Sequence, residues 1–238
     1  MSYQIIPARF TPECAAFLKA KAAANPGLIE FGQHGLHHSM ALGGRTLKRE
    51  FGPERSLAEQ AAIIVEGKVL LEERLGGETI DVFTPPQHKF DRNTVKAASA
   101  AGHRVFSVSC YGSLRHQLAY GLGRRLGLSS IMHHGISYSG GARPEAPIVE
   151  LSIALGADDG RSLSADPAAI APAMQRLSAR GGPVGLMLHH KLYGDEMGRA
   201  ALDAICTGLA GLGPERFAQL GDLGRAMDAG SGAARRLG

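Results

Sequence analysis

Short apolar segments alternate with longer segments of helical periodicity along most of this chain. The apolar segments have the length of strands and lie at residues 3–6, 28–31, 81–84, 105–108, 148–153 and 183–188. The helical segments lie between them, at residues 12–24, 56–75, 91–101, 166–180 and 196–212. Strands that alternate with helices in this way are typical of βα units that form a parallel sheet. The pattern predicts an α/β domain over residues 1–228 and a loose polar tail over residues 229–238.

A capping-box pattern opens the longest predicted helix. Ser56 is followed three residues later by Glu59, so each residue can satisfy a backbone N–H that the first helical turn leaves free. We expect the core-facing side of this helix to consist of its apolar positions, which are Ala62, Ile63, Val65, Val69 and Leu70. The Gly-rich and charged segment 41–55, which precedes the helix, is interpreted as an exposed loop.

Histidine residues follow three of the predicted strands. His34 and His38 lie four residues apart after the second strand, and His88 and His189 follow two later strands. Chemistry in parallel α/β folds gathers at the carboxyl ends of the strands, so these side chains are expected in one cleft. Two imidazoles separated by one helical turn can bind one metal ion through neutral ring nitrogens. A catalytic zinc ion usually has about three protein ligands and a water, so a third ligand remains to be found.

Several other residues are weaker candidates for a site. His37 is interpreted as a neighbour that faces away, and a functional role is less expected for His190 than for His189. His133 and His134 are adjacent, so their side chains are expected to diverge. The acidic pair at 158–159 precedes a glycine and is typical of a turn, and Cys110 is interpreted as a core residue.

Three segments together carry a family resemblance. They read FGQHGLHH at 31–38, FTPPQH at 83–88 and GLMLHH at 185–190, in this order and at plausible separations. The set resembles landmark motifs of the polysaccharide deacetylase family, which has the NodB-homology fold and is also called carbohydrate esterase family 4. The resemblance extends from about residue 3 to residue 210. It implies a distorted (β/α) barrel that deacetylates an amino sugar or oligosaccharide with a divalent metal, usually zinc.

The resemblance also assigns roles to individual residues. It implies that His34 and His38 bind the metal and that His189 is the acid that protonates the leaving amine. The turn formed by residues 85–87 would line the acyl site, with the backbone N–H of Gln87 as an oxyanion donor. The substrate-binding residues implied in this way are Pro86, Gln87 and His88.

The chain departs from the family pattern at its catalytic base. Family members begin with a strand that ends in an Asp-Asp pair, of which one carboxylate is the base and the other the third metal ligand. Here the segment 3–6 matches the family's second strand, and no Asp or Glu precedes Glu13. Thr84 replaces the arginine that would orient the base, and the family's fourth-motif Trp is absent because the chain has no Trp. We therefore expect either a barrel without its first βα unit or a site built differently.

Two further interpretations follow from these departures. The chain could be a catalytically inactive homologue that binds a glycan or a protein partner. A barrel without its first strand would expose an unpaired sheet edge, which favours a gapped barrel or a homodimer.

The composition argues against other classes of function. The net charge is +4, and the 26 Lys and Arg residues are scattered, so nucleic-acid binding is not expected. No apolar run of about 18 residues and no basic-then-apolar leader occurs, so neither membrane insertion nor secretion is expected. The three cysteines are far apart and include no Cys-x-x-Cys pair, which favours reduced thiols and a cytoplasmic location.

Overall fold

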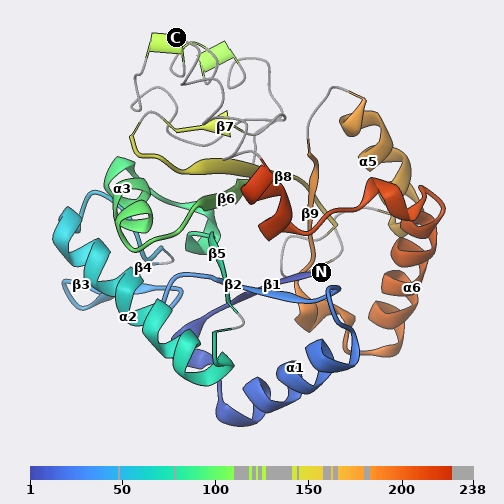
Figure 1. Ribbon diagram of the computed structural model, residues 1–238, viewed down its shortest axis with the longest axis horizontal. Helices are drawn as coiled ribbons and strands as arrows, with labels where there is room; N and C mark the ends of the chain where they lie inside the picture. The colour runs from blue at the N-terminus through green and yellow to red at the C-terminus, as the bar shows by residue number, and fades with distance from the viewer. Residues whose placement is uncertain are drawn as a thin grey trace.

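A mostly parallel sheet forms the centre of the computed structural model (Figure 1). The structure describes residues 1–47, 49–77, 79–109, 118–119, 122, 125–126, 141–143, 145–157, 162, 166–179 and 183–226. The parallel strands, in spatial order, are β1 (Ser2–Ile5), β2 (Glu30–Gln33), β5 (Thr79–Phe83), β6 (Val105–Ser109), β8 (Val149–Gly156) and β9 (Gly185–Met187). The short strand β7 (Gly141–Ala142) pairs antiparallel with the first residues of β8.

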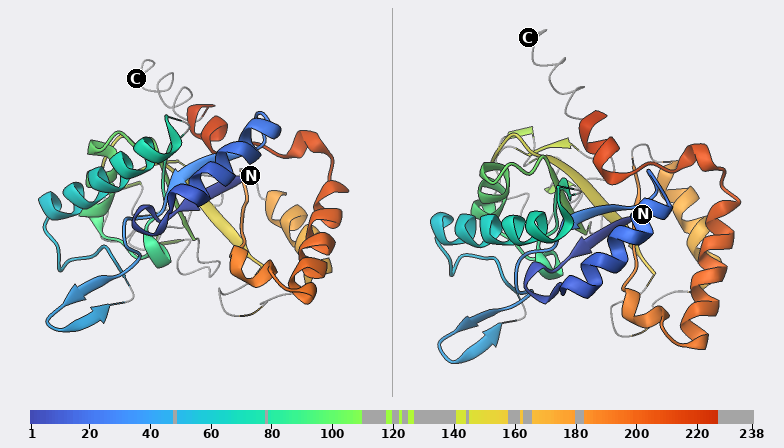
Figure 2. Two further views of the ribbon diagram at one scale, coloured as in Figure 1. Left: turned by 90° about the horizontal axis from the view of Figure 1, so that it is seen from below. Right: turned by 60° about the horizontal axis from the view of Figure 1, so that its bottom comes forward.

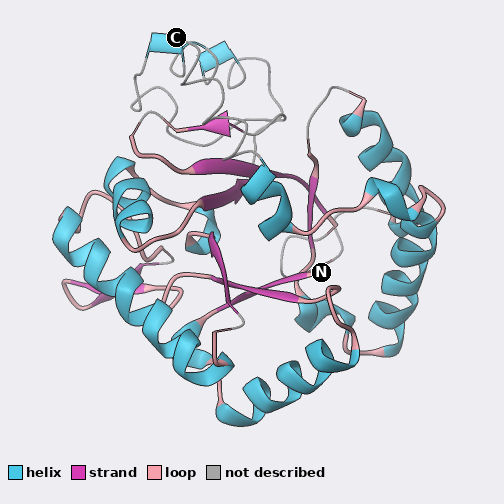
Figure 3. Ribbon diagram, in the orientation of Figure 1, coloured by secondary structure: helices cyan, strands magenta, loops and turns pink. Residues whose placement is uncertain are grey.

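Helices lie around the outside of this sheet (Figure 3). The α-helices are α1 (Pro12–Ala24), α2 (Leu57–Leu75), α3 (Arg92–Ala100), α5 (Ile170–Ser178) and α6 (Glu196–Ala210), and residues 220–226 are also helical. Short 3-10 helices are η1 (Pro7–Arg9), η2 (Pro86–His88), η3 (Pro167–Ala169), η4 (His190–Tyr193) and η5 (Pro214–Arg216). This order of strands and helices confirms the α/β architecture predicted from the sequence.

The sheet is curved but is not closed into a barrel by the described strands (Figure 2). Strand β1 is one end of the sheet, β7 and β9 both pair with β8 at the other, and no ladder joins β1 to either within the described part of the chain. The predicted closure into a distorted barrel is therefore not observed there. The absence of a first βα unit and the homodimer both stay predictions.

Three neighbouring strands end at the same level of the sheet. Ile5 of β1 is paired with Gln33 of β2, and Gln33 is paired with Phe83 of β5. The residues that follow these strands therefore emerge at one edge, because the strands are parallel. This register places His34 beside Thr84 and explains why histidines distant in the sequence can meet.

The main core is aromatic and lies beneath that edge. Phe83 is fully buried, and its ring contacts Phe51 edge-on with centroids 5.5 Å apart. Phe106 lies on another side of Phe83, with centroids 5.9 Å apart, and also packs against Phe90 at 4.9 Å. Burial of each such ring stabilises the fold by about 1.5–3 kcal/mol. The core therefore holds the end of β5 rigidly.

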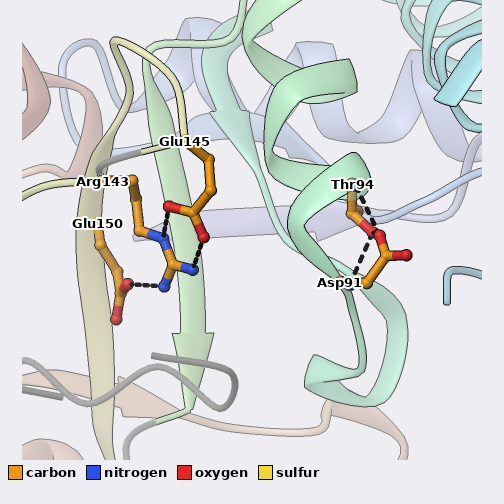
Figure 4. Close-up of polar contacts among 5 residues, drawn as sticks. All are labelled: Asp91, Thr94, Arg143, Glu145 and Glu150. Carbon is orange, nitrogen blue, oxygen red and sulfur yellow. Dashed lines mark hydrogen bonds and ion pairs between the residues drawn. The ribbon is translucent and has the colours of Figure 1, made fainter. Parts of the chain in front are cut away.

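Buried polar contacts attach α3 to α2 at its first turn. Asp91 accepts a hydrogen bond from the Thr94 backbone N–H at 3.0 Å, and this capping box begins α3 (Figure 4). Gln60 of α2 donates to Asp91 at 3.2 Å and accepts from the Thr94 hydroxyl at 2.6 Å. These contacts satisfy side chains that would otherwise be costly to bury.

A buried ionic cluster lies toward the amino end of β8, far along the strand from the histidines. The Arg143 guanidinium donates to both carboxylate oxygens of Glu145, at 3.1 and 2.6 Å, and to Glu150 at 2.8 Å (Figure 4). It also lies 5.4 Å from the centre of the Phe90 ring. Arg143 therefore ties the start of β8 to the aromatic core.

The structure corrects the predicted face of α2. Val65 and Val69 are 47% and 45% exposed, although they were expected to face the core. The buried side of the helix is formed by Gln60, Ile64, Gly67, Leu71 and Leu75. Gly67 lacks a side chain because β2 approaches closely: a Cβ there would lie 2.3 Å from Gln33 Nε2. The apolar pattern missed this face because it includes Gln60, which is polar, and Gly67, which has no side chain.

Two further expectations are also corrected. Leu28 is 64% exposed, and the second strand begins at Glu30. The segment 41–55 was expected to be an exposed loop, but it contains the hairpin β3 (Met40–Leu42) and β4 (Arg45–Leu47), followed by the fully buried Glu50 and Phe51. Within the described residues, no helix combines the length and the apolar character that a bilayer crossing needs.

Candidate metal and active site

His34 directly follows β2 and is held by its neighbours. Its backbone N–H donates to Ile5 O at 2.7 Å, and its ring Nδ1 lies 3.0 Å from Thr84 O. Because a carbonyl oxygen only accepts, Nδ1 carries the proton and the lone pair of Nε2 is free. Burial, followed by the nearby His38, lowers the pKa of His34 to about 3. His34 is therefore a neutral imidazole in the tautomer that a metal ligand requires.

His38 lies beside His34. The two ring centroids are 5.0 Å apart and the planes are inclined by 58°. Two imidazoles that share one tetrahedral zinc would have centroids about 5 Å apart, because each nitrogen lies about 2.0–2.1 Å from the metal. The pKa of His38 is lowered mainly by burial and then by Arg9, while Glu50 opposes this shift. The pair thus has a spacing that suits one shared metal ion.

His88 and His189 lie near this pair. His88 belongs to η2 and has a left-handed backbone with φ 55°, as does Gln87. Burial, then the neighbouring His189 and His38, lowers the pKa of His88 to about 4. His189 follows β9 by two residues and also acts electrostatically on His34 and His38. The structure therefore brings together the four histidines that the sequence expected in one cleft.

The predicted acyl-site turn packs against residues 34–38, which we call the histidine loop. Pro86 is buried, and a Cβ at Gly35 would lie 2.5 Å from Pro86 Cγ. The Gln87 side chain is exposed. The ring Nε2 of His88 lies 3.3 Å from Met187 Sδ at the end of β9. These contacts place Pro86, Gln87 and His88 beside the histidines, and their roles in substrate binding stay predictions.

A third metal ligand is not found in the part of the chain that the structure describes. No group of three or more His, Cys, Asp or Glu residues there is arranged to hold a metal ion. The replacement ligands considered at 133–134 lie outside the described residues, as do the acidic pair at 158–159 and Cys110. Metal binding by His34 and His38 therefore stays a prediction, with no third ligand among the described residues.

Thr84 has a different role from that of the arginine in the family pattern. Its hydroxyl donates to Gln4 Oε1 of β1 at 3.0 Å, and its carbonyl oxygen accepts from His34. Thr84 therefore links β1 to β5 and orients the first histidine. It has no charge with which to orient a carboxylate base.

Glu50 is a residue of this region that the sequence interpretation missed. Its carboxylate is fully buried and accepts hydrogen bonds from the backbone N–H groups of Leu36, His37 and His38. The surrounding charged and glycine residues suggested exposure. The one signal that could have revealed it is Phe51, an apolar residue that directly follows it and lies in the core.

A buried hydrogen-bond network centred on Gln33 contacts the histidine loop. Gln33 Nε2 donates to Gly35 O at 3.1 Å and to Ile64 O at 2.9 Å. Gln33 Oε1 lies 2.9 Å from Nε2 of His103, which is buried. Since the amide oxygen accepts, His103 carries its proton on Nε2. The network joins the loop, α2 and His103, which lies two residues before β6.

The burial of His103 is expected to make the fold sensitive to acid. Burial, then Lys68, lowers the pKa of His103 to about 3, whereas an unfolded histidine titrates near 6.5. Between these values the unfolded chain binds more protons, so the free energy of unfolding falls as pH decreases, by about 1.4 kcal/mol per pH unit for this group. We expect the free energy of unfolding, measured with urea, to differ less between pH 7.5 and pH 5 in His103→Gln than in the wild type. The exposed His190→Gln is the matched control, and an unchanged pH dependence in His103→Gln would contradict this assignment.

Comparisons with known proteins are informative at the level of the fold. No protein family profile matches the chain, and no curated protein sequence matches it. Among solved structures, that of a "putative polysaccharide deacetylase" from Mycobacterium smegmatis is similar, with a TM-score of 0.64 and 17% sequence identity. The match covers 97% of this chain and 72% of that chain. The chain therefore has a polysaccharide deacetylase fold.

Proposed function

We propose that this protein is a polysaccharide deacetylase-like hydrolase that removes N-acetyl groups from an amino-sugar substrate with a divalent metal, zinc. One observation carries the proposal. His34 and His38 are paired with ring centroids 5.0 Å apart, and the half-buried His34 has its Nδ1 proton directed to Thr84 O. Neutral imidazoles suit metal binding, and the fold is similar to that of a "putative polysaccharide deacetylase".

The residues around the pair would have different roles in the reaction. His34 and His38 would hold the metal, which when bound lowers the pKa of a water and polarises the acyl carbonyl. His189 would donate a proton to the amine nitrogen as its bond to the acyl carbon breaks. The turn that contains Pro86 and Gln87 would orient the acetyl group. Glu50 is engaged by three backbone N–H groups, so it is not a free base.

A second candidate function is a catalytically inactive homologue that binds a glycan. Two observations favour it. Thr84 is hydrogen-bonded to Gln4 where the family pattern has an arginine, and the described residues include no third metal ligand. Without a base and a third ligand, the residues around the histidines would still bind a sugar while the amide bond stays intact.

Release of acetate separates the two functions. We expect the wild-type protein with added zinc to release acetate from N-acetylated chito-oligosaccharides, because the metal activates water beside the acyl group. His189→Ala is expected to be slower by at least about 100-fold, since general acid catalysis contributes about 10²–10⁴-fold. His190→Ala, which removes the exposed neighbouring imidazole, is the matched control.

Two other results would count against the proposed function. Equal rates in the wild type and His189→Ala would contradict the role of His189. Absence of acetate release by the zinc-loaded wild type, together with retained binding of the oligosaccharide, would favour the inactive homologue.

A further inference from the structure

A buried carboxylate lies under the histidine loop and takes no part in the proposed chemistry. Glu50 has no exposed surface. Its Oε2 accepts from Leu36 N at 3.0 Å and from His38 N at 3.1 Å, and its Oε1 accepts from His37 N at 2.8 Å. Three consecutive backbone N–H groups thus surround one carboxylate. Charge-assisted bonds of this kind are about twice as strong as neutral ones.

The loop that Glu50 binds has an unusual backbone. Gly35 and His38 have φ values of +61° and +70°, in the left-handed region. Glycine adopts this region freely, but it is unfavourable for histidine and persists only where neighbouring contacts enforce it. The N–H of His38 is one of the three groups that Glu50 binds. Glu50 is therefore a contact that stabilises His38 in this conformation.

The space around Glu50 is fitted to the same loop. A Cβ at Gly35 would lie 2.2 Å from Glu50 Oε2, so only glycine allows the carboxylate to approach. On its other side, Glu50 is fixed by its own backbone: its carbonyl oxygen accepts from Arg55 at 2.9 Å. The adjacent Phe51 anchors this segment in the aromatic core. Glu50 thus links residues 36–38 of the loop to the core.

We infer that Glu50 is a positioning residue, which holds the loop so that the imidazole of His38 faces that of His34. This inference rests on the proposed function, in which the two imidazoles share a metal ion. Glu50 acts through the backbone of residues 36–38, and it does not itself ligate the metal. Its three N–H partners use three of the about four lone-pair sites of the carboxylate.

Amide hydrogen exchange of the metal-free protein tests the structural half of the inference. In the wild type, the amides of Leu36, His37 and His38 are expected to be protected. In Glu50→Gln they are expected to exchange at least about 10-fold faster, because the amide group offers one acceptor and directs its own donors at the loop. Glu54→Gln is the matched control, since it makes the same change at an exposed glutamate of the same segment.

Zinc titration tests the functional half. Glu50→Gln is expected to bind zinc about 10- to 100-fold more weakly than the wild type, the usual effect of removing a group that orients a metal ligand. Glu54→Gln is expected to bind zinc like the wild type. Loss of all zinc binding together with normal protection of residues 36–38 would indicate instead that Glu50 is itself a ligand.

The two halves also separate failure of this inference from failure of the proposed function. A wild-type protein that binds no zinc contradicts the proposed function, while the exchange data still decide whether Glu50 holds the loop. Unprotected amides in the wild type, or equal protection in Glu50→Gln, overturn the inference. So does an equal zinc affinity in a folded Glu50→Gln variant.

Discussion

Replacing His34 by alanine is expected to weaken zinc binding by at least about 100-fold. The reason is that Nε2 of His34 carries a lone pair on a half-buried neutral ring whose other nitrogen donates a hydrogen bond to Thr84 O. Loss of a group that only orients a ligand already costs about 10- to 100-fold, and loss of the ligand itself should cost more. Competition with a chelator of known zinc affinity would measure the change.

The control for this substitution lies in the same loop. His37 has an exposed side chain and contributes only its backbone N–H to Glu50, which alanine would retain. His37→Ala is therefore expected to bind zinc as the wild type does. If His34→Ala also retained wild-type affinity, while its circular dichroism was unchanged, the metal would have to be bound elsewhere.

The largest loss of stability is expected from Phe83→Ala. Phe83 is fully buried and lies between Phe51 and Phe106. Truncation of a buried Phe removes its transfer free energy and leaves a cavity, so the free energy of unfolding should fall by about 3–5 kcal/mol. Urea unfolding monitored by circular dichroism would measure it. Because Phe83 precedes Thr84, the zinc affinity of the folded fraction is also expected to fall.

Phe17 supplies the matched control for the core. It lies on α1 with 59% of its surface exposed, so Phe17→Ala is expected to change the free energy of unfolding by less than about 0.5 kcal/mol. A loss below 1 kcal/mol for Phe83→Ala would show that the aromatic cluster is not the main core.

Elements with strong local signals could be predicted from the sequence. The capping box of Ser56 and Glu59 begins α2, and Gly76 ends it in a left-handed conformation, as expected for such residues. The predicted strands correspond to β1, β2, β5, β6, β8 and β9, with ends that differ by a few residues. These features depend on neighbours in the chain, so a local pattern carries them.

Features that depend on tertiary contact could not be predicted in the same way. Gly67 faces the site because β2 approaches α2 there, and hydropathy does not distinguish this glycine from a flexible one. Glu50 appears in a charged segment, yet three backbone N–H groups from another segment satisfy it. A buried charge is visible only when its partners are known.

For the candidate site, the proximity of the histidines could be predicted from the sequence, but a third metal ligand could not. His34, His88 and His189 each follow a strand, so the rule that chemistry gathers at carboxyl ends of strands anticipated their proximity. The pairing of Ile5, Gln33 and Phe83 supplies the physical reason, because it aligns the strand ends. The third metal ligand, by contrast, has no counterpart in the family motifs of this sequence and was not predicted.

The central claim is that His34 and His38 converge on one metal ion. Zinc X-ray absorption of protein loaded with one zinc per chain tests it most directly. The account predicts imidazole nitrogens at about 2.0–2.1 Å from zinc, with outer-shell imidazole scattering that decreases in His34→Ala and in His38→Ala. A spectrum without imidazole scattering, or one that neither substitution changes, would contradict it.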